Sequence, residues 1–295
     1  PDGFEKPAEL LVRALDELLD YQDYPVIAAE RSTMNRRPLG IGIINFAYWM
    51  AKNNMTYSEP NLHMINDWAE AWSYYLIKAS LDLAKKDGAC PLNYQTKYGD
   101  GVVPIDTYKK EVDEITSEEL NYDWESLRKS ISEHGLRNST LSAQMPSESS
   151  SVVSNATNGI EPPRDFLSIK KSKKGPLKQI VPSYQSLKNQ YTLLWDMKDN
   201  GGYIRVVSVM QKFFDQAISG NWSYNPENYP NNEVPVSVMA NDFLTTYKYG
   251  WKTSYYQNTH DMKSDEIEES PTSEVESLLT ELSNLEEGEC ESCAV

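Results

Sequence analysis

Apolar side chains recur every three or four residues in several parts of the chain, which is the spacing of helices with one buried face. This pattern predicts helices over residues 6–21, 45–52, 61–86, 123–135, 203–219 and 236–249. Short apolar runs predict strands over residues 139–143, 166–169, 179–182 and 251–256. Since helices alternate with short strands, the predicted fold class is α/β.

The C-terminal end of the chain differs in composition from the rest. Twelve acidic residues and a single lysine lie between His260 and Val295, so this segment holds most of the net charge of -16. It is rich in Glu and Ser and poor in aromatic residues, a composition typical of disorder. We therefore expect a folded body, residues 1–259, and a flexible acidic tail, residues 260–295. Apolar spacing over residues 275–285 favours a transient helix over one that docks on a partner.

Two classes of partner are disfavoured by the sequence. Phosphate backbones require clustered Lys and Arg, and the densest basic run, residues 170–174, ends in Gly175-Pro176 and indicates a hairpin loop. The most apolar stretch, residues 41–51, is too short to cross a bilayer, and no apolar leader opens the chain. Three cysteines do not indicate a disulfide framework. We expect a cytoplasmic protein that binds neither nucleic acid nor membrane.

A serine-rich stretch follows the predicted strand at residues 139–143. Its order places Ser147 or a neighbour at a helix N-cap, and Asn158-Gly159 can stop that helix. A helix start offers unpaired N–H groups and a positive dipole end, and nearby hydroxyls add donors, so the stretch is a candidate phosphate cradle. A serine-rich cap without a ligand is the commoner alternative. The candidate residues are Pro146, Ser147, Glu148, Ser149 and Ser150.

The tail ends in a Cys-x-x-Cys pair, Cys290 and Cys293. A zinc site usually takes four ligands, and the nearest other candidate, His260, lies thirty residues upstream, so no metal is expected. A dithiol on a flexible arm can be oxidised in one place and reduced in another, because thiol–disulfide exchange requires only access and a thiolate. The third cysteine, Cys90, is predicted to be a buried thiol.

Two adjacent tyrosines, Tyr255 and Tyr256, end the predicted body. Adjacent tyrosines usually serve packing, as we expect for Tyr74 and Tyr75 inside the predicted helix 61–86. The second pair differs because its position, beside the tail, allows a partner to approach. Position alone does not decide between packing and function.

Several motifs together are similar to the large (α) subunit of ribonucleotide reductase. The resemblance covers residues 7–293 and follows the order of that family. Its motifs are Arg36-Arg37-Pro38-Leu39-Gly40-Ile41-Gly42, the positions Trp124, Leu127, Gly135, Leu136, Arg137, Asn138, Ser142, Ala143 and Pro146, the run Ser154-Asn155-Ala156-Thr157-Asn158-Gly159-Ile160-Glu161-Pro162-Pro163, the run Tyr255-Tyr256-Gln257-Asn258-Thr259 and the terminal cysteine pair.

The resemblance implies a role for each candidate. Pro146 to Ser150 would hold the diphosphate of a ribonucleoside diphosphate substrate. Tyr255 and Tyr256 would relay a radical that arises at the metal site of a separate small (β) subunit, and this chain would bind no cofactor itself. Cys290 and Cys293 would reduce the active-site disulfide after each turnover and be recharged by thioredoxin or glutaredoxin.

The resemblance also implies an incomplete barrel. The Asn-x-Cys-x-Glu loop that carries the radical cysteine of the family does not occur in this sequence, nor do two further cysteines in the context of the active-site pair. The chain is therefore expected to be the C-terminal half of a ten-stranded α/β barrel, which works with a separate N-terminal half to reduce ribonucleoside diphosphates. The alternative is a non-catalytic fragment that binds and titrates the small subunit. A free-standing dithiol oxidoreductase is disfavoured, because the Cys-x-x-Cys pair does not begin a helix after a strand.

Overall fold

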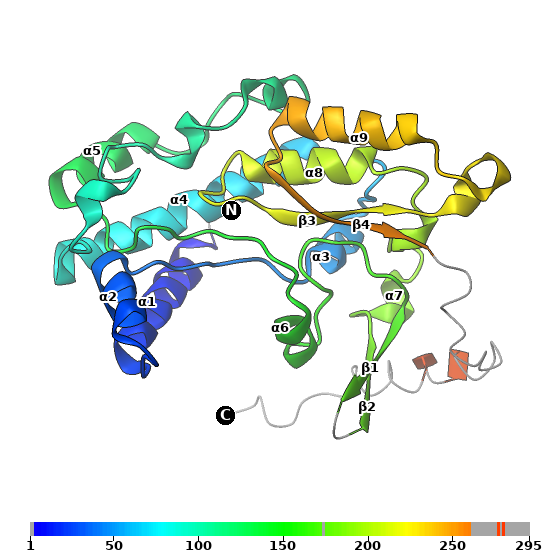
Figure 1. The fold of residues 1–295 in the computed structure, drawn as a ribbon, viewed down its shortest axis with the longest axis horizontal. Coiled ribbons are helices and arrows are strands. Elements are labelled where there is room, and N and C mark those ends of the chain that lie inside the picture. The colour runs from blue at the N-terminus through cyan, green and yellow to red at the C-terminus, as the bar shows by residue number, and fades with distance from the viewer. Residues whose placement is uncertain (1–2, 173–174, 261–275, 278, 281–295) are drawn as a thin grey trace.

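The computed structural model describes residues 3–172, 175–260, 276–277 and 279–280 of the chain. Helices and short strands alternate along it (Figure 1). The helices are α1 (Glu5–Tyr21), α2 (Ile27–Arg36), α3 (Phe46–Lys52), α4 (Leu62–Asp87), α5 (Trp124–His134), α6 (Glu148–Val153), α7 (Tyr184–Leu187), α8 (Gly201–Gln211) and α9 (Val236–Tyr249). The strands are β1 (Leu167–Ser172), β2 (Gly175–Ile180), β3 (Ser219–Tyr224) and β4 (Thr253–Thr259).

Most of the predicted helices are confirmed, and α9 spans the predicted residues. The prediction for residues 203–219 is wrong in its second half, because α8 ends at Gln211 and β3 begins at Ser219. The side chain of Gln211 explains the change: its amide donates to Gln216 O and accepts from Ile218 N, at 2.9 Å each. These bonds stabilise a turn where the apolar pattern alone would continue a helix. Helix α2 was not predicted, and none of its residues is buried.

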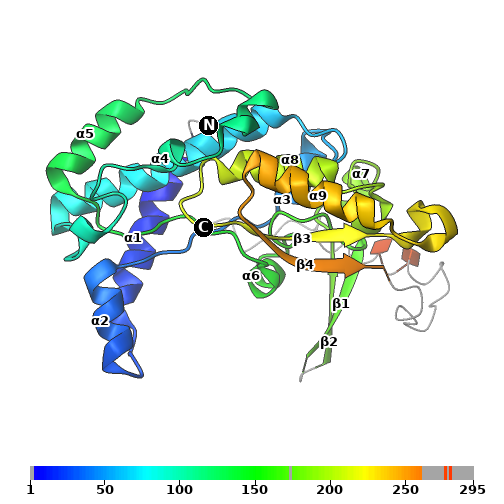
Figure 2. The same ribbon diagram turned by 45° about the horizontal axis from the view of Figure 1, so that its top comes forward.

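Helices α4, α8 and α9 form a layer on one side of the β3–β4 pair (Figures 1 and 2). Helix α4 packs against α1, α5 and α8, and α8 packs against α9. Figures 1 and 2 both show α8 and α9 side by side next to β3. Trp222 of β3 contacts Phe243 of α9, and Tyr203 of α8 contacts Trp251, with ring centroids 6.4 and 5.8 Å apart. The main apolar core therefore lies between α3, α8 and the inner face of β3.

Extended segments run parallel beside one another under this layer. Ile41 pairs with Ser142 in a parallel bridge, so residues 139–143 are extended as predicted but form no full strand. On the other side of this segment, Ser219 N at the start of β3 donates to Gln144 O at 2.9 Å. Strand β3 then pairs in parallel with β4. The segment that leads to the serine-rich stretch thus lies directly beside the strand pair that carries the two tyrosines.

The β1–β2 pair is an antiparallel hairpin that projects from the body (Figures 1 and 2). It confirms the strand prediction at residues 166–169, although β1 extends further than expected. Strand β2 overlaps the predicted strand 179–182 only at its last two residues, Gln179 and Ile180. Lys170 and Lys171 belong to β1 and not to the predicted loop. The intervening residues 173–174 lie outside the described residues, as does most of the predicted tail.

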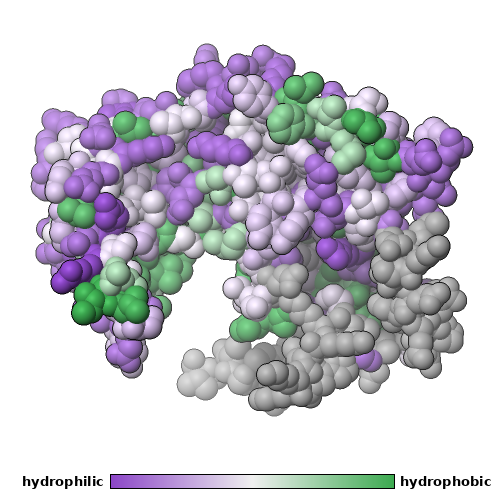
Figure 3. Space-filling view, in the orientation of Figure 1, coloured by the Kyte–Doolittle hydropathy of each residue, from purple (hydrophilic) through white to green (hydrophobic). Residues whose placement is uncertain are grey.

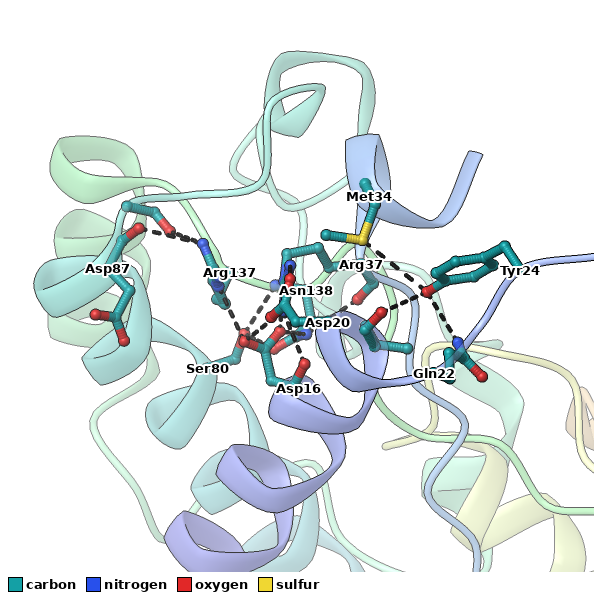
Figure 4. Close-up of polar contacts among 12 residues, drawn as sticks. Asp16, Asp20, Gln22, Tyr24, Met34, Arg37, Ser80, Asp87, Arg137 and Asn138 are labelled. Atoms are coloured by element: carbon teal, nitrogen blue, oxygen red, sulfur yellow. Dashed lines mark hydrogen bonds and ion pairs between the residues drawn. The ribbon is translucent and has the colours of Figure 1, made fainter. Parts of the chain in front are cut away.

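A buried ionic network joins two motifs of the resemblance to α1 (Figure 4). Arg37 ends α2 in the left-handed conformation, with φ 46°, and its guanidinium pairs with Asp16, Nε to Oδ1 2.7 Å. Arg137 Nε lies 3.0 Å from the other Asp16 oxygen, and Asn138 Nδ2 donates to Asp16 Oδ1 at 2.9 Å. Since a buried charge is costly unless paired and hydrogen-bonded, these residues are held together as a unit. Their role in this structure is to fix α1 against residues 36–42 and 137–138.

Candidate functional site

A β-bulge in β4 brings the two adjacent tyrosines together. Gly220 pairs with Ser254 and Trp222 pairs with Gln257, so Asn221 alone faces both Tyr255 and Tyr256. In a regular strand, successive side chains point to opposite faces of the sheet. The extra residue of a bulge changes these directions. The ring centroids of Tyr255 and Tyr256 consequently lie 4.3 Å apart, with 61° between the ring planes.

This tyrosine pair lies at the surface. The two residues are 55% and 59% exposed, respectively, which is high for large aromatic side chains. A hydrogen bond to the Tyr255 side chain, followed by the charge of Tyr255, raises the pKa of Tyr256. The two phenol groups are therefore close enough to form a hydrogen bond with each other, and both are accessible to an approaching group.

The serine-rich stretch begins α6 as predicted. Ser147 is the N-cap, but its hydroxyl donates to Met145 O at 3.0 Å and makes no cap bond. Its own N–H donates to Asn158 Oδ1 at 2.8 Å. The helix ends at Val153, before the predicted stop at residues 158–159, and Asn158 instead folds back onto the helix start. The first turn of a helix leaves N–H groups without intrahelical acceptors, so the chemistry of a phosphate cradle is present here.

The surface of this candidate cradle is open. Pro146, Ser149 and Ser150 are exposed, and Ser147 is half-buried. The approach to it is rigid, because the Gln144 amide accepts from Ile43 N at 2.8 Å and donates to Ile43 O at 3.0 Å. Gly42 lies so close that a Cβ there would be 2.7 Å from Ala143 O.

Three hydrogen bonds join the segments that flank the cradle to the strands of the tyrosine pair. Gln144 O accepts from Ser219 N at the start of β3. Further along β3, Asn221 Nδ2 donates to Glu161 Oε1 at 2.7 Å, and Asn221 Oδ1 accepts from Tyr256 N at 3.0 Å. Figures 1 and 2 place α6 on one side of the β3–β4 pair and α8 and α9 on the other. The predicted phosphate and tyrosine residues are thus parts of one connected region.

Comparison with known proteins decides what this region belongs to. The family model of the ribonucleotide reductase barrel domain matches residues 1–257. The chain belongs to this family. Its barrel domain is 58% identical over 255 residues to the ribonucleoside-diphosphate reductase subunit alpha of Haemophilus influenzae, covering 86% of this chain and 34% of that relative.

Two further relatives carry closely similar names. The ribonucleoside-diphosphate reductase 1 subunit alpha of Escherichia coli is 57% identical over 248 residues, which cover 84% of this chain and 33% of the relative. The subunit alpha of Enterobacteria phage T4 is 44% identical over 262 residues, which cover 88% of this chain and 34% of the relative. The chain therefore spans about a third of the length of these relatives.

Several residues of this barrel domain that shape the region were not identified from the sequence. Asp215 accepts hydrogen bonds from Leu141 N at 2.6 Å and from Tyr98 Oη at 2.9 Å, and burial raises its pKa. It holds the segment that leads to the cradle. Asn221 was also missed, because no strand was predicted over residues 219–224, where β3 forms.

The predicted cysteine sites of the chain have different outcomes. Cys90 is buried, and burial raises the pKa of its thiol, so the predicted buried thiol is confirmed. Cys290 and Cys293 lie outside the described residues. In the parts of the chain that are described, no group of three or more His, Cys, Asp or Glu side chains is arranged to hold a metal ion. No helix among those parts has the length and apolarity needed to span a membrane.

Proposed function

We propose that this chain is the C-terminal part of the catalytic barrel in a ribonucleoside-diphosphate reductase large subunit. It acts with an N-terminal half, which supplies the reactive cysteine, and with a small subunit, which supplies the radical from its metal site. The substrate is a ribonucleoside diphosphate and the product a deoxyribonucleoside diphosphate. The proposal holds whether the N-terminal half is a separate polypeptide or not. The observation that carries it is the exposed tyrosine pair of β4 in a chain of this family.

In this proposal Tyr255 and Tyr256 are the last phenols of the radical relay. Their rings are in contact, so a proton and an electron can pass between them over a short distance. Their exposure favours this role over packing, because a relay from another subunit needs an open end. The residue that receives the radical belongs to the N-terminal half.

Pro146 to Ser150 are proposed to hold the substrate diphosphate. Two supports are the helix start at Ser147 and the exposed hydroxyls of Ser149 and Ser150. Replacing both Ser149 and Ser150 by Ala is expected to raise the KM for CDP about ten-fold or more, because hydrogen bonds to charged groups are stronger than neutral ones. Ser154→Ala, an exposed serine just beyond α6, is the control and is expected to leave KM unchanged.

The tail cysteines are proposed to restore the active site. After each turnover Cys290 and Cys293 would reduce the active-site disulfide by thiol–disulfide exchange and become a disulfide themselves. Thioredoxin or glutaredoxin would then reduce that disulfide. Replacing Cys290 by Ser is expected to stop multiple turnover with thioredoxin as reductant while a first turnover remains.

The small subunit is proposed to dock on α9. Exposed apolar side chains form a stripe along this helix, and they gather over α9 in Figure 3. The stripe consists of Val236, Phe243, Leu244 and Tyr247, which are 79%, 59%, 63% and 69% exposed, respectively. Contiguous exposed apolar groups mark interaction surfaces, and α9 leads through Gly250 directly into the tyrosine strand. Leu244→Glu is expected to weaken small-subunit binding about ten-fold or more, whereas Leu10→Glu, at a 54% exposed position of α1, serves as control.

The deciding experiment is dCDP formation from CDP by this chain together with an N-terminal half and a small subunit. We expect activity with the wild-type chain and none with Tyr256→Phe, which lacks the phenol but keeps the ring. Tyr94→Phe removes another exposed phenol and is expected to retain activity. Full activity of Tyr256→Phe would contradict the radical role. Binding of the small subunit without dCDP formation in any combination would favour the non-catalytic fragment.

A further inference from the structure

The bulge in β4 leaves the backbone N–H of Tyr256 to be bound by a side chain and not by the backbone of β3. Because Asn221 faces two residues, the backbone of β3 cannot pair with both Tyr255 and Tyr256. The N–H of Tyr256 is instead bound by a side chain, Asn221 Oδ1, at 3.0 Å. A backbone N–H is a strong hydrogen-bonding group, so the position of this acceptor influences where the bulge forms.

A neighbouring carboxylate determines which end of the Asn221 amide faces the bulge. An amide side chain has one accepting oxygen and one donating nitrogen, whereas an ionised carboxylate only accepts. Glu161 Oε1 lies 2.7 Å from Asn221 Nδ2. The nitrogen must therefore face Glu161, which turns the oxygen toward Tyr256 N. A hydrogen bond to an ionised group is also stronger than one between neutral groups.

Glu161 itself is held from two directions. The preceding residue, Ile160, is buried, and its carbonyl accepts from the fully buried Tyr57 hydroxyl at 2.7 Å. Three residues before Glu161, Asn158 binds the N–H of Ser147. The carboxylate is therefore placed by a segment that is anchored in the core and also contacts the candidate cradle.

We propose that Glu161 and Asn221 act in series as positioning residues that hold the rings of Tyr255 and Tyr256 in contact. Neither residue is proposed to take part in radical transfer itself. Their effect on catalysis rests on the proposed function of the tyrosine pair, but their effect on ring geometry does not.

The first test is Asn221→Asp in the full chain, assembled with the N-terminal half and the small subunit. The new carboxylate would lie against that of Glu161, and two like charges at this distance repel. The amide orientation is lost and the bulge shifts. We expect kcat for dCDP formation to fall about 100-fold, the order expected for a misplaced reacting group, with KM for CDP unchanged. Asn228→Asp makes the same chemical change at an exposed asparagine and is expected to leave both constants unchanged.

The second measurement reports ring contact without any turnover. A ¹³C-labelled tyrosine placed at position 256 keeps the natural phenol, and its ionisation in alkaline solution can be followed by NMR. Since contact with Tyr255 raises the pKa of Tyr256, separation of the rings should lower the measured pKa. We expect this fall with Asn221→Asp and none with Asn228→Asp.

A paired exchange distinguishes positioning from general damage to the fold. Combining Asn221→Asp with Glu161→Gln places a donating amide opposite the new carboxylate, whose other oxygen can still accept from Tyr256 N. We expect kcat of the double variant to be at least ten-fold higher than that of Asn221→Asp. We also expect the pKa of Tyr256 to return to its raised value. Should Asn221→Asp fail to fold, Glu161→Gln alone permits the Asn221 amide to turn, and a smaller fall of the same pKa is expected.

The outcomes separate this proposal from the proposed function. A lower pKa in Asn221→Asp that the exchange restores supports the positioning role, even if dCDP formation does not change, in which case the radical role of the pair fails. An unchanged pKa in Asn221→Asp and in Glu161→Gln overturns the positioning role, whatever the activity.

Discussion

The chain contains two pairs of adjacent tyrosines that differ in almost every physical respect. Tyr74 and Tyr75 lie in α4, half-buried, with ring centroids 5.5 Å apart. Tyr122 stacks on Tyr74 at 4.7 Å, and Trp124 meets it edge-on at 5.5 Å. Tyr255 and Tyr256, by contrast, are more than half exposed. Within the described part of the chain, their only aromatic ring contact is with each other.

The difference shows that adjacency of two tyrosines in the sequence does not by itself indicate a function. In a helix, neighbouring side chains diverge around the axis, so each ring of the α4 pair packs against rings from elsewhere. In β4, a bulge turns two neighbouring rings toward each other and leaves them at the surface. We infer that the first pair contributes to stability and the second to activity, and the following predictions test this contrast.

The largest expected effect is on stability. Tyr74→Ala removes a ring that contacts several others and is expected to lower the free energy of unfolding by about 2–4 kcal/mol. Tyr255→Ala removes an exposed ring and is expected to change it by less than about 0.5 kcal/mol. Urea unfolding of the full chain, followed by circular dichroism, measures both. Equal losses of unfolding free energy in Tyr74→Ala and Tyr255→Ala would contradict the proposed difference between the two pairs.

An intermediate effect on stability is expected from a substitution in β3, the strand that pairs with β4 beside the second tyrosine pair. A Cβ at Gly220 would lie 2.7 Å from Tyr203 Oη and 2.8 Å from Trp251 Cζ2. Gly220→Ala should therefore overpack the core beside the bulge and lower the free energy of unfolding by about 1–3 kcal/mol. At Gly40 the nearest atom to such a Cβ is 3.5 Å away, so Gly40→Ala is the control, with less than about 0.5 kcal/mol expected. If Gly220→Ala left the free energy of unfolding unchanged, β3 would be free to shift and accommodate the added Cβ.

The smallest effect is expected in alkaline solution. Burial, and next the charge of Asp123, raises the pKa of Tyr74. The folded chain thus binds this proton more tightly than the unfolded chain, so its contribution is complete below about pH 10, the ordinary pKa of Tyr, and is lost as the pH rises through the folded pKa. Tyr74→Phe should make the decline of unfolding free energy above pH 10 less steep. Urea midpoints measured at pH 8 to 11 test this, and an unchanged slope would contradict it.

The helices were the most predictable part of the fold. Five of the six predicted helices form within two residues of the expected ends, because the apolar spacing that defines them is local. The sixth failed where Gln211 binds the backbone of residues 216–218, an interaction that no periodicity reveals. Strand β3 was missed for the same reason.

The candidate site was predictable in its residue types but not in its geometry. The N-cap at Ser147 is confirmed, since N-cap preference depends on the residue type and its immediate neighbours. The contact of Asn158 with Ser147 and that of Glu161 with Asn221 join residues 11 and 60 positions apart. Such contacts depend on how segments meet in space, so the sequence pattern offers no sign of them.

By itself, the sequence determined the class of elements, most helix positions, the neighbouring tyrosines and the family resemblance that the comparison confirms. These features follow from local spacing, residue chemistry and motif order. Only the tertiary structure decided that the predicted helix stops at Gln211, that a bulge turns the tyrosine rings together and that one pair is exposed while the other is packed. The physical reason is that strand pairing and side-chain contacts between distant residues are set by the packing of the whole chain.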